Sequence, residues 1–143
     1  MTTIAYRDGV LAADTRMTLH DQIEGRQVKV VKRGRVLAAA SGTAAMCRDF
    51  RSWVSAGCIG APPPTPSANN PDLSYWGFIA TPDACFLIND AGLIRLDVPY
   101  YAMGSGGEFA AGAMAVGATA EEAVRAAMTL DCKSGGDVVS VRH

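Results

Sequence analysis

The sequence predicts a layered α+β fold in which β-sheets lie inside and helices cover them. Strand-like segments come first, one helical segment interrupts them, and two helical segments precede a final strand. Runs such as VLAA, VLAAA and CFLI are apolar at consecutive positions, as expected for strands covered on both faces. No linker or repeat divides the 143 residues, so we expect one domain spanning 1–143.

Two turn signals place β-hairpins in the first third of the chain. Asp8-Gly9 and Arg33-Gly34 each separate two apolar runs, and Asp-Gly in particular adopts positive φ at little cost. The strands expected around these turns are residues 3–7, 10–14, 27–32 and 35–41.

The rest of the chain alternates between regular elements and breaks. Residues 58–74 hold five of the seven prolines, which excludes a helix or a central strand there. Thr119 and Glu122 have the spacing of a capping box at a helix start. The other elements that we expect are helices at 43–56, 108–116 and 120–130 and strands at 75–81, 84–89, 93–97 and 137–142.

Composition excludes several classes of protein. Hydrophobic residues make up 49% of the chain, which is too many for intrinsic disorder. A formal net charge of −1 gives no basis for binding nucleic acid or an anionic membrane. The four cysteines form no CxxC pair and suit reduced thiols, and the start lacks a signal peptide's apolar run, so we expect a cytoplasmic protein. With only His20 and His143, most zinc sites and histidine-based triads are ruled out, and we expect no metal or cofactor.

Three charged residues occupy positions where an apolar residue would be expected. Asp131 falls on the apolar face of the last helix and at its C-terminus, where the helix dipole disfavours an anion. Lys29 lies between two valines of a strand, and Asp14 ends a strand. Each also has an ordinary interpretation: a frayed helix end, a solvated strand edge and a turn residue respectively.

Thr2 is a further candidate. A small second residue usually indicates that the initiator methionine is removed. Removal would leave a hydroxyl and a free α-amine on one residue, and the amine has a reference pKa near 8. One residue could then supply both nucleophile and general base.

Four fragments in order resemble one family. They are TTIAYRDGVLAADTRMT, then KV before an apolar strand ending in SGTAA, then AMGSGGEFAAGA, and then LDCKSGG before the last strand. Together they are similar to proteasome β-type and HslV-like N-terminal nucleophile hydrolases. The resemblance implies a four-layer αββα sandwich. It also implies a shortened member, in which the Pro-rich loop 58–74 replaces the second helix of one outer layer.

The resemblance assigns roles by position. Thr2 would be the nucleophile and its amine the base. Lys29 would lower the pKa of both groups, and Asp14, supported by Arg16, would orient Lys29. The Gly42 N–H would form the oxyanion hole. The terminal amine would be hydrogen-bonded by Ser105, Asp131 and Ser134.

The resemblance also places a substrate pocket beside the nucleophile. Its small and apolar side chains favour a roomy, hydrophobic pocket. The expected lining residues are Met17, Thr18, Gln27, Val31, Ala40 and Ala44.

The first hairpin bears on this site through its register. A two-residue loop at Asp8-Gly9 would place Thr3 opposite Asp14 and turn Thr2 to the other face. A three-residue loop with Gly9 as a bulge would instead pair Thr2 with Asp14. We predict the second register.

The implied function is a threonine-type peptidase that cleaves peptides or unfolded proteins through an acyl-enzyme, inside a homo-oligomeric ring. No nucleotide-binding motif is present, so any ATP-dependent unfoldase would be a separate partner. Trp53, Trp76 and Phe78 surround the proline-rich segment, and we expect a neighbouring subunit, rather than the loop itself, to cover them. The alternatives are a catalytically silent structural or assembly subunit, another amidase and an unrelated binding module.

Overall fold

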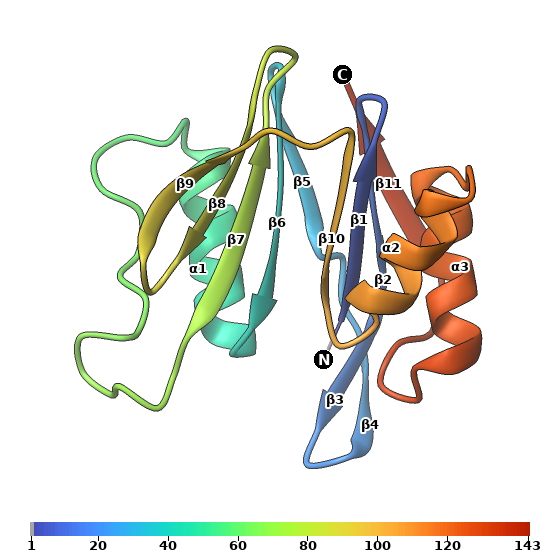
Figure 1. Ribbon diagram of the computed structural model, residues 1–143. Helices are drawn as coiled ribbons and strands as arrows, with labels where there is room; N and C mark the ends of the chain where they lie inside the picture. Colours follow the sequence, from blue (N-terminus) through green and yellow to red (C-terminus); the bar gives the residue numbers. More distant parts are fainter. Residues whose placement is uncertain (1) are drawn as a thin grey trace.

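Two antiparallel β-sheets form the interior of the molecule, and the computed structural model describes residues 2–143 (Figure 1). The first sheet has four strands in the order β10-β1-β2-β11. Their bounds are Tyr100–Gly104, Thr3–Arg7, Val10–Asp14 and Val138–Arg142. The second sheet has five strands in the order β5-β6-β7-β8-β9. Their bounds are Val30–Arg33, Val36–Gly42, Tyr75–Ala80, Cys85–Asn89 and Gly92–Leu96.

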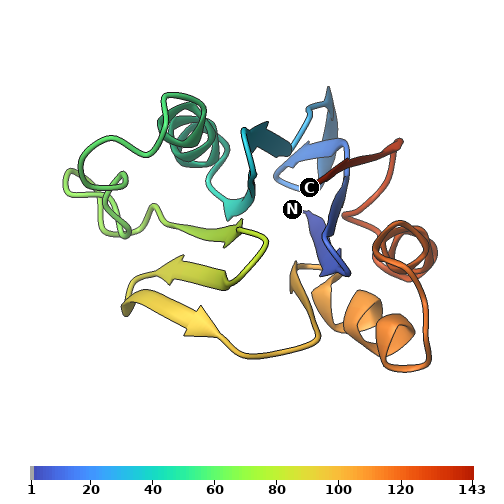
Figure 2. The ribbon, with the colours of Figure 1, turned by 90° about the horizontal axis from the view of Figure 1, so that it is seen from above.

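Helices cover the outward face of each sheet (Figure 2). Helix α1 (Ala44–Ser55) packs on β5, β6 and β7. Helices α2 (Gly107–Ala115) and α3 (Ala120–Leu130) pack on the four-stranded sheet. The predicted capping box is confirmed, because the Thr119 hydroxyl accepts from Glu122 N and the Glu122 carboxylate accepts from Thr119 N.

The central strands of the four-stranded sheet, β1 and β2, are buried on both faces, as the apolar run in β2 predicts. Ile4 and Leu11 pack between the two sheets, together with Phe78 of β7. Ala5 and Ala12 point the other way and pack under α2 and α3. Alternate side chains of a strand therefore serve two separate cores.

Three strands were not anticipated from the sequence. Strands β3 (Arg16–Leu19) and β4 (Gln22–Arg26) form a hairpin that projects beyond the sheets (Figure 1). Its turn residues His20 and Asp21 both have positive φ. Strand β10 pairs with β1 and completes the edge of the four-stranded sheet.

The predicted register of the first hairpin is wrong. Asp8 and Gly9 both have positive φ, at 50° and 77°, and form a two-residue turn closed by Arg7 opposite Val10. Asp8 thus adopts the left-handed conformation that the prediction reserved for Gly9. The two-residue turn was expected to point Thr2 away from Asp14, but it does not. Thr2 precedes the paired strand, and its hydroxyl still reaches the Asp14 carboxylate.

The proline-rich segment 58–74 contains no helix or strand and folds back over α1 and β7. The Trp53 indole donates to the Ile59 carbonyl, and the Tyr75 hydroxyl donates to the Pro63 carbonyl. The expectation that Phe78 borders this segment is wrong, because β7 turns that ring into the space between the sheets. Trp76 stays 45% exposed.

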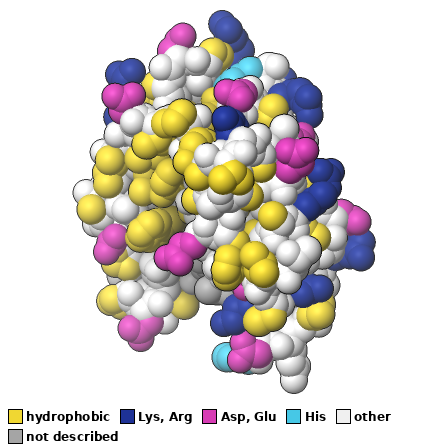
Figure 3. Space-filling model, turned by 45° about the vertical axis from the view of Figure 1, so that its right-hand side comes forward, with side chains coloured by type: hydrophobic (Ala, Val, Ile, Leu, Met, Phe, Trp, Pro, Cys, Tyr) yellow, Lys and Arg dark blue, Asp and Glu magenta, His cyan; other side chains and the backbone are white. Residues whose placement is uncertain are grey.

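Apolar side chains remain on the surface, and the left half of Figure 3 shows a broad area of them. Large hydrophobic side chains with a high exposed fraction include Leu93 of β9 and Val116 after α2. Within residues 2–143 no helix is both long and apolar enough to cross a membrane.

Candidate active site

The Asp14 carboxylate is the centre of a buried polar cluster at one end of the two sheets. It ends β2, is fully buried and accepts four hydrogen bonds. Its Oδ1 accepts from Thr2 Oγ1 at 3.0 Å, from Thr3 N at 2.9 Å and from Lys29 Nζ at 2.8 Å. Its Oδ2 accepts from Gly135 N at 2.9 Å. A buried carboxylate needs such donors, and here they hold it in one orientation.

Lys29 brings a positive charge to the same oxygen that accepts the Thr2 hydroxyl. Its side chain is 7% exposed, and Nζ also donates to the Arg16 carbonyl at 2.6 Å. Burial lowers the pKa of Lys29, and the Asp14 carboxylate opposes that shift. The sequence predicts that Lys29 lies within a strand, whereas in the structure it directly precedes β5.

Arg16 supports the pair through its backbone. Its carbonyl accepts from Lys29, whereas its guanidinium donates to the Cys132 carbonyl at 3.0 Å. That guanidinium also packs directly on Gly135, where a Cβ atom would lie 2.3 Å from Arg16 Cζ. Arg16 therefore fixes the segment after α3 against the end of β2.

Asp131 is the C-cap residue of α3, and its carboxylate accepts hydrogen bonds from two hydroxyl groups. Ser105 Oγ and Ser134 Oγ both donate to Oδ2 at 2.6 Å, and Lys133 N donates to Oδ1 at 3.1 Å. Burial alone would raise the pKa of Asp131, but these three hydrogen bonds together lower it. The carboxylate is 9% exposed, so the apolar face of α3 did indicate a partnered anion rather than a frayed end.

This second cluster touches the start of β1. Ser105 Oγ, which donates its proton to Asp131, also lies 3.4 Å from the Thr2 carbonyl oxygen. The Ser134 hydroxyl has one proton, which it donates to Asp131. The Thr3 hydroxyl therefore donates to Ser134 Oγ, and the two oxygens lie 2.6 Å apart. The expected bonds to a free Thr2 amine depend on loss of Met1, which lies outside the described residues. They stay a prediction.

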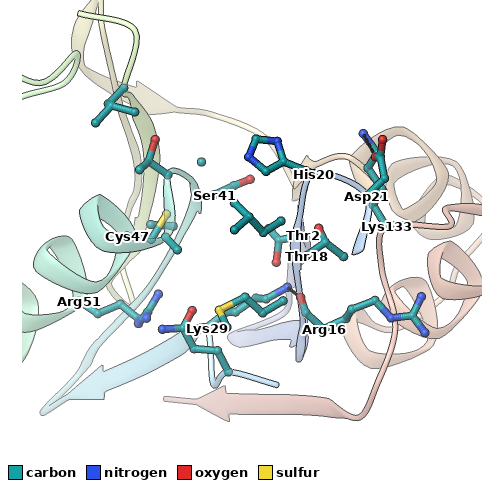
Figure 4. Close-up of a pocket in the computed structure, with 18 residues that line it drawn as sticks. Thr2, Arg16, Thr18, His20, Asp21, Lys29, Ser41, Cys47, Arg51 and Lys133 are labelled. Atoms are coloured by element: carbon teal, nitrogen blue, oxygen red, sulfur yellow. Dashed lines mark hydrogen bonds and ion pairs between the residues drawn. The ribbon is translucent and has the colours of Figure 1, made fainter. Parts of the chain in front are cut away.

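A cavity of about 450 Å³ opens beside Thr2, and Figure 4 shows Thr2, Lys29 and Arg51 facing it from three separate parts of the chain. Of the predicted pocket residues, the structure places five in the lining: Met17, Thr18, Gln27, Ala40 and Ala44. Gly42 and Lys29 line it as well.

Val31 is the exception, and its predicted place in the pocket is wrong. It follows Lys29 on β5 by two positions and shares its face. At that point α1 already covers the sheet, so Val31 packs into the cluster around Phe50 and Val54 instead.

Several lining residues were missed from the sequence. Cys47 and Arg51 follow Ala44 at helical spacing, a signal that could have found them. The other missed residues with charged or titratable side chains lie in loops, and no sequence motif indicates that these loops reach the cavity. They are His20, Asp21 and Lys133.

Gly42 ends β6 where the chain turns into α1, and its geometry requires glycine. Its φ is +134°, and a Cβ atom would lie 2.5 Å from the Ser74 carbonyl oxygen. The next residue, Thr43, donates its N–H to that same carbonyl at 2.9 Å. The turn is thus pinned to the end of the proline-rich segment.

Among the described residues that line the cavity, Cys47 is the one with a thiol, and that thiol is unreactive at neutral pH. Burial raises its pKa to about 11, although the cations Arg51 and Lys29 act in the opposite direction. At neutral pH it is a thiol rather than a thiolate nucleophile. In the part of the chain that the structure describes, no group of His, Cys, Asp and Glu side chains could hold a metal ion.

The sequence matches no protein-family model and no curated protein. Its fold, however, is similar to solved structures. Thiobacillus denitrificans BPH, solved alone and in complex with epoxomicin, aligns with a TM-score of 0.71 and 22% identity, over 98% of this chain and 95% or 96% of that one. HslV from Trypanosoma brucei aligns with a TM-score of 0.70 and 17% identity, over 99% of both chains.

The chain therefore has an HslV-like α+β fold. Because the identities are low, this likeness concerns the backbone arrangement and not the chemistry of the site. Because the alignments cover nearly all of both partners, they give no support to the expected shortening, which stays a prediction.

Proposed function

We propose that this chain is a threonine-type peptidase whose nucleophile is Thr2, exposed after removal of Met1. The observation that carries the proposal is the shared Asp14 oxygen, which accepts both the Thr2 hydroxyl and the Lys29 ammonium at the edge of the cavity. A hydroxyl beside a fixed cation is easier to deprotonate, because the cation stabilises the developing alkoxide.

In the proposed reaction, Thr2 Oγ attacks the carbonyl carbon of a bound peptide while the free α-amine of Thr2 takes its proton. The carbonyl oxygen becomes negatively charged and is stabilised by the N–H of Gly42. The amine then returns the proton to the leaving nitrogen, the C–N bond breaks, and an ester joins Thr2 to the acyl fragment. Water attacks the ester by the same route and restores the hydroxyl.

The other residues keep these groups in place. Asp14 orients Lys29, and Lys29 lowers the pKa of the Thr2 hydroxyl and amine. Ser105, Asp131 and Ser134 would hold the amine once it is free. Their existing contacts with Asp131 and the Thr2 carbonyl support this role, because they already lie beside the first residues of β1.

The proposal extends to the whole assembly. Residues 1–143 would form one four-layer αββα domain, with α1 and the proline-rich loop as a reduced outer layer. Copies of the chain would form a cytoplasmic ring that encloses the sites and receives peptides or unfolded proteins, with any ATP-dependent unfoldase as a separate partner. The exposed apolar side chains, such as Leu93 at 65% exposure, support burial against another subunit. A compact monomer in sedimentation at micromolar concentration would contradict the ring.

The central test combines a mass measurement with an activity assay. The natively expressed protein should have lost one methionine and should cleave short fluorogenic peptides. Thr2→Ala should lower cleavage by about a thousandfold or more, whereas Thr2→Ser keeps a hydroxyl and should retain part of it. Epoxomicin, which one BPH structure contains, serves as a trial inhibitor.

Other outcomes separate the alternatives. Retained Met1 without cleavage of any peptide would indicate a silent structural or assembly subunit. Loss of Met1 with Thr2-dependent cleavage of small amides, but not peptides, would indicate another amidase.

A further inference from the structure

Helix α1 contributes one stripe of side chains to the cavity. Ala44, Cys47 and Arg51 all line it, and their spacing of three and four residues places them on one face of the helix. Ala44 lies in the first turn, next to Gly42, and Arg51 lies two turns further, about 10 Å along the axis. Side chains of a helix lean toward its N-terminus, which directs the Arg51 side chain toward the Ala44 end of the cavity. Figure 4 shows Arg51 entering from the side of α1, with Arg16 and Lys133 on the far side.

Arg51 has no counter-ion in the described chain. It is half-buried and makes no hydrogen bond or salt bridge with any residue from 2 to 143. Burial lowers its pKa, Cys47 opposes the shift, and Arg48 adds to it. The ordinary pKa of arginine lies so far above neutrality that the group stays charged. Cys47 cannot neutralise it, because the thiol has a pKa of about 11.

The other charges of the lining already have partners. Lys29 pairs with Asp14, and Arg16 donates to the Cys132 carbonyl. At the mouth, Lys133 lies 3.5 Å from Asp21, the sole carboxylate among the lining residues that the structure describes. Burying part of a cation without a nearby anion costs free energy. A carboxylate that enters the cavity would therefore form a favourable ion pair with Arg51.

We infer that Arg51 makes this cavity a binding site for an acidic side chain, and that the residue preceding the cleaved bond is preferentially glutamate. The inference rests on the proposed peptidase function and deepens it. Met17, Ala40 and Ala44 supply apolar walls for the methylene groups, which agrees with the hydrophobic walls expected from the sequence. The cationic end of the cavity was not expected. Because Arg51 lies two turns of α1 beyond Ala44, the longer side chain of glutamate should reach it better than that of aspartate.

The test uses four fluorogenic peptides that differ only in the residue before the cut: Glu, Asp, Leu or Lys. The full chain should cleave the Glu peptide with the highest kcat/KM. Arg51→Leu should lower that value about 10- to 100-fold, the size of a lost hydrogen bond to a charged group, and leave the Leu peptide within about threefold. Arg48→Leu is the matched control, because Arg48 is exposed on the same helix, faces Asp49 and lies outside the cavity; it should change neither value.

Two results would overturn the inference. One is a wild-type preference for Leu or Lys. The other is an equal loss for all four peptides in both Arg51→Leu and Arg51→Gln when thermal unfolding shows that these variants are folded.

A binding experiment separates this inference from the peptidase proposal. Acetylated tripeptides ending in Glu or Leu are titrated into the Thr2→Ala variant by calorimetry, with and without Arg51→Leu. Tighter binding of the Glu peptide that depends on Arg51, in a chain that cleaves nothing, would uphold the acidic site while the peptidase function fails. Equal binding of both peptides would refute the acidic site even in an active peptidase.

Discussion

Lys29 and Asp14 form a buried ion pair, with 2.8 Å between Nζ and Oδ1, that joins the two sheets. Asp14 ends β2 of the four-stranded sheet, and Lys29 directly precedes β5 of the five-stranded sheet. The pair therefore stabilises the contact between the sheets as well as holding charge beside Thr2.

Lys29→Met should damage stability and activity together. The change leaves the buried Asp14 carboxylate without its counter-ion, which we expect to cost about 3–5 kcal/mol in the free energy of unfolding. Peptide cleavage should fall by at least about a hundredfold, since the cation near Thr2 is gone. Urea denaturation and the fluorogenic assay measure the two effects. Lys32→Met, at an exposed position of β5, is the control and should change neither.

Asp131 should make stability depend on acid pH. The folded chain lowers its pKa, so its contribution is present above the unfolded value near 3.9 and is lost as pH falls through the folded value. Ser105→Ala removes one donor and should cost about 1–2 kcal/mol at pH 6 and less at pH 2.5, because acid shifts Asp131 toward its neutral form. Denaturation curves at the two pH values measure this. An equal cost at both would show that the Ser105 hydroxyl does not stabilise the carboxylate.

Gly42→Ala should destabilise the chain by about 2–3 kcal/mol, because it combines positive φ with a collision against the Ser74 carbonyl. Gly25→Ala separates the two causes. Gly25 has a similar positive φ of +144°, but its Cβ position is open, so it should cost only about 1–2 kcal/mol. Thermal unfolding of both variants decides the matter, and equal costs would mean that the close contact is relieved elsewhere.

Cys47 should be inert despite lining the cavity. With its pKa at about 11, less than one thiol in a hundred is ionised at pH 8, so iodoacetamide should leave cleavage unchanged at that pH. Cys132 is exposed and serves as the internal comparison for alkylation, detected by peptide mass mapping. Rapid loss of cleavage with modification of Cys47 would point to a cysteine nucleophile and against Thr2.

Local sequence signals predicted most of the fold. Helix 120–130 was placed at the bounds that the structure gives it, because Thr119 and Glu122 mark its start. The β3–β4 hairpin escaped prediction, because its turn uses His20 and Asp21 in the left-handed region rather than a glycine. Strand β10 escaped because a five-residue run before a glycine-rich turn carries no periodicity of its own.

The site was predictable only in part. Residues that bear unusual charge in an apolar setting, Asp14, Lys29 and Asp131, do lie beside the start of β1. The Gly135 N–H that holds Asp14 left no signal, because a backbone donor has no side chain to mark it. The register of the first hairpin was missed because it was chosen to place Thr2 opposite Asp14. Asp8-Gly9 instead forms the two-residue turn that its positive φ angles favour, and Thr2 still reaches Asp14.

The four bonds to Asp14 also set an order of assembly. They join residues 2 and 3 to residue 29 and to residue 135, almost the full length of the chain. A growing polypeptide emerging from the ribosome cannot complete this arrangement until nearly all of it has been synthesised. The proposed nucleophile would thus gain its surroundings last, which would keep a half-made protein from cutting its neighbours.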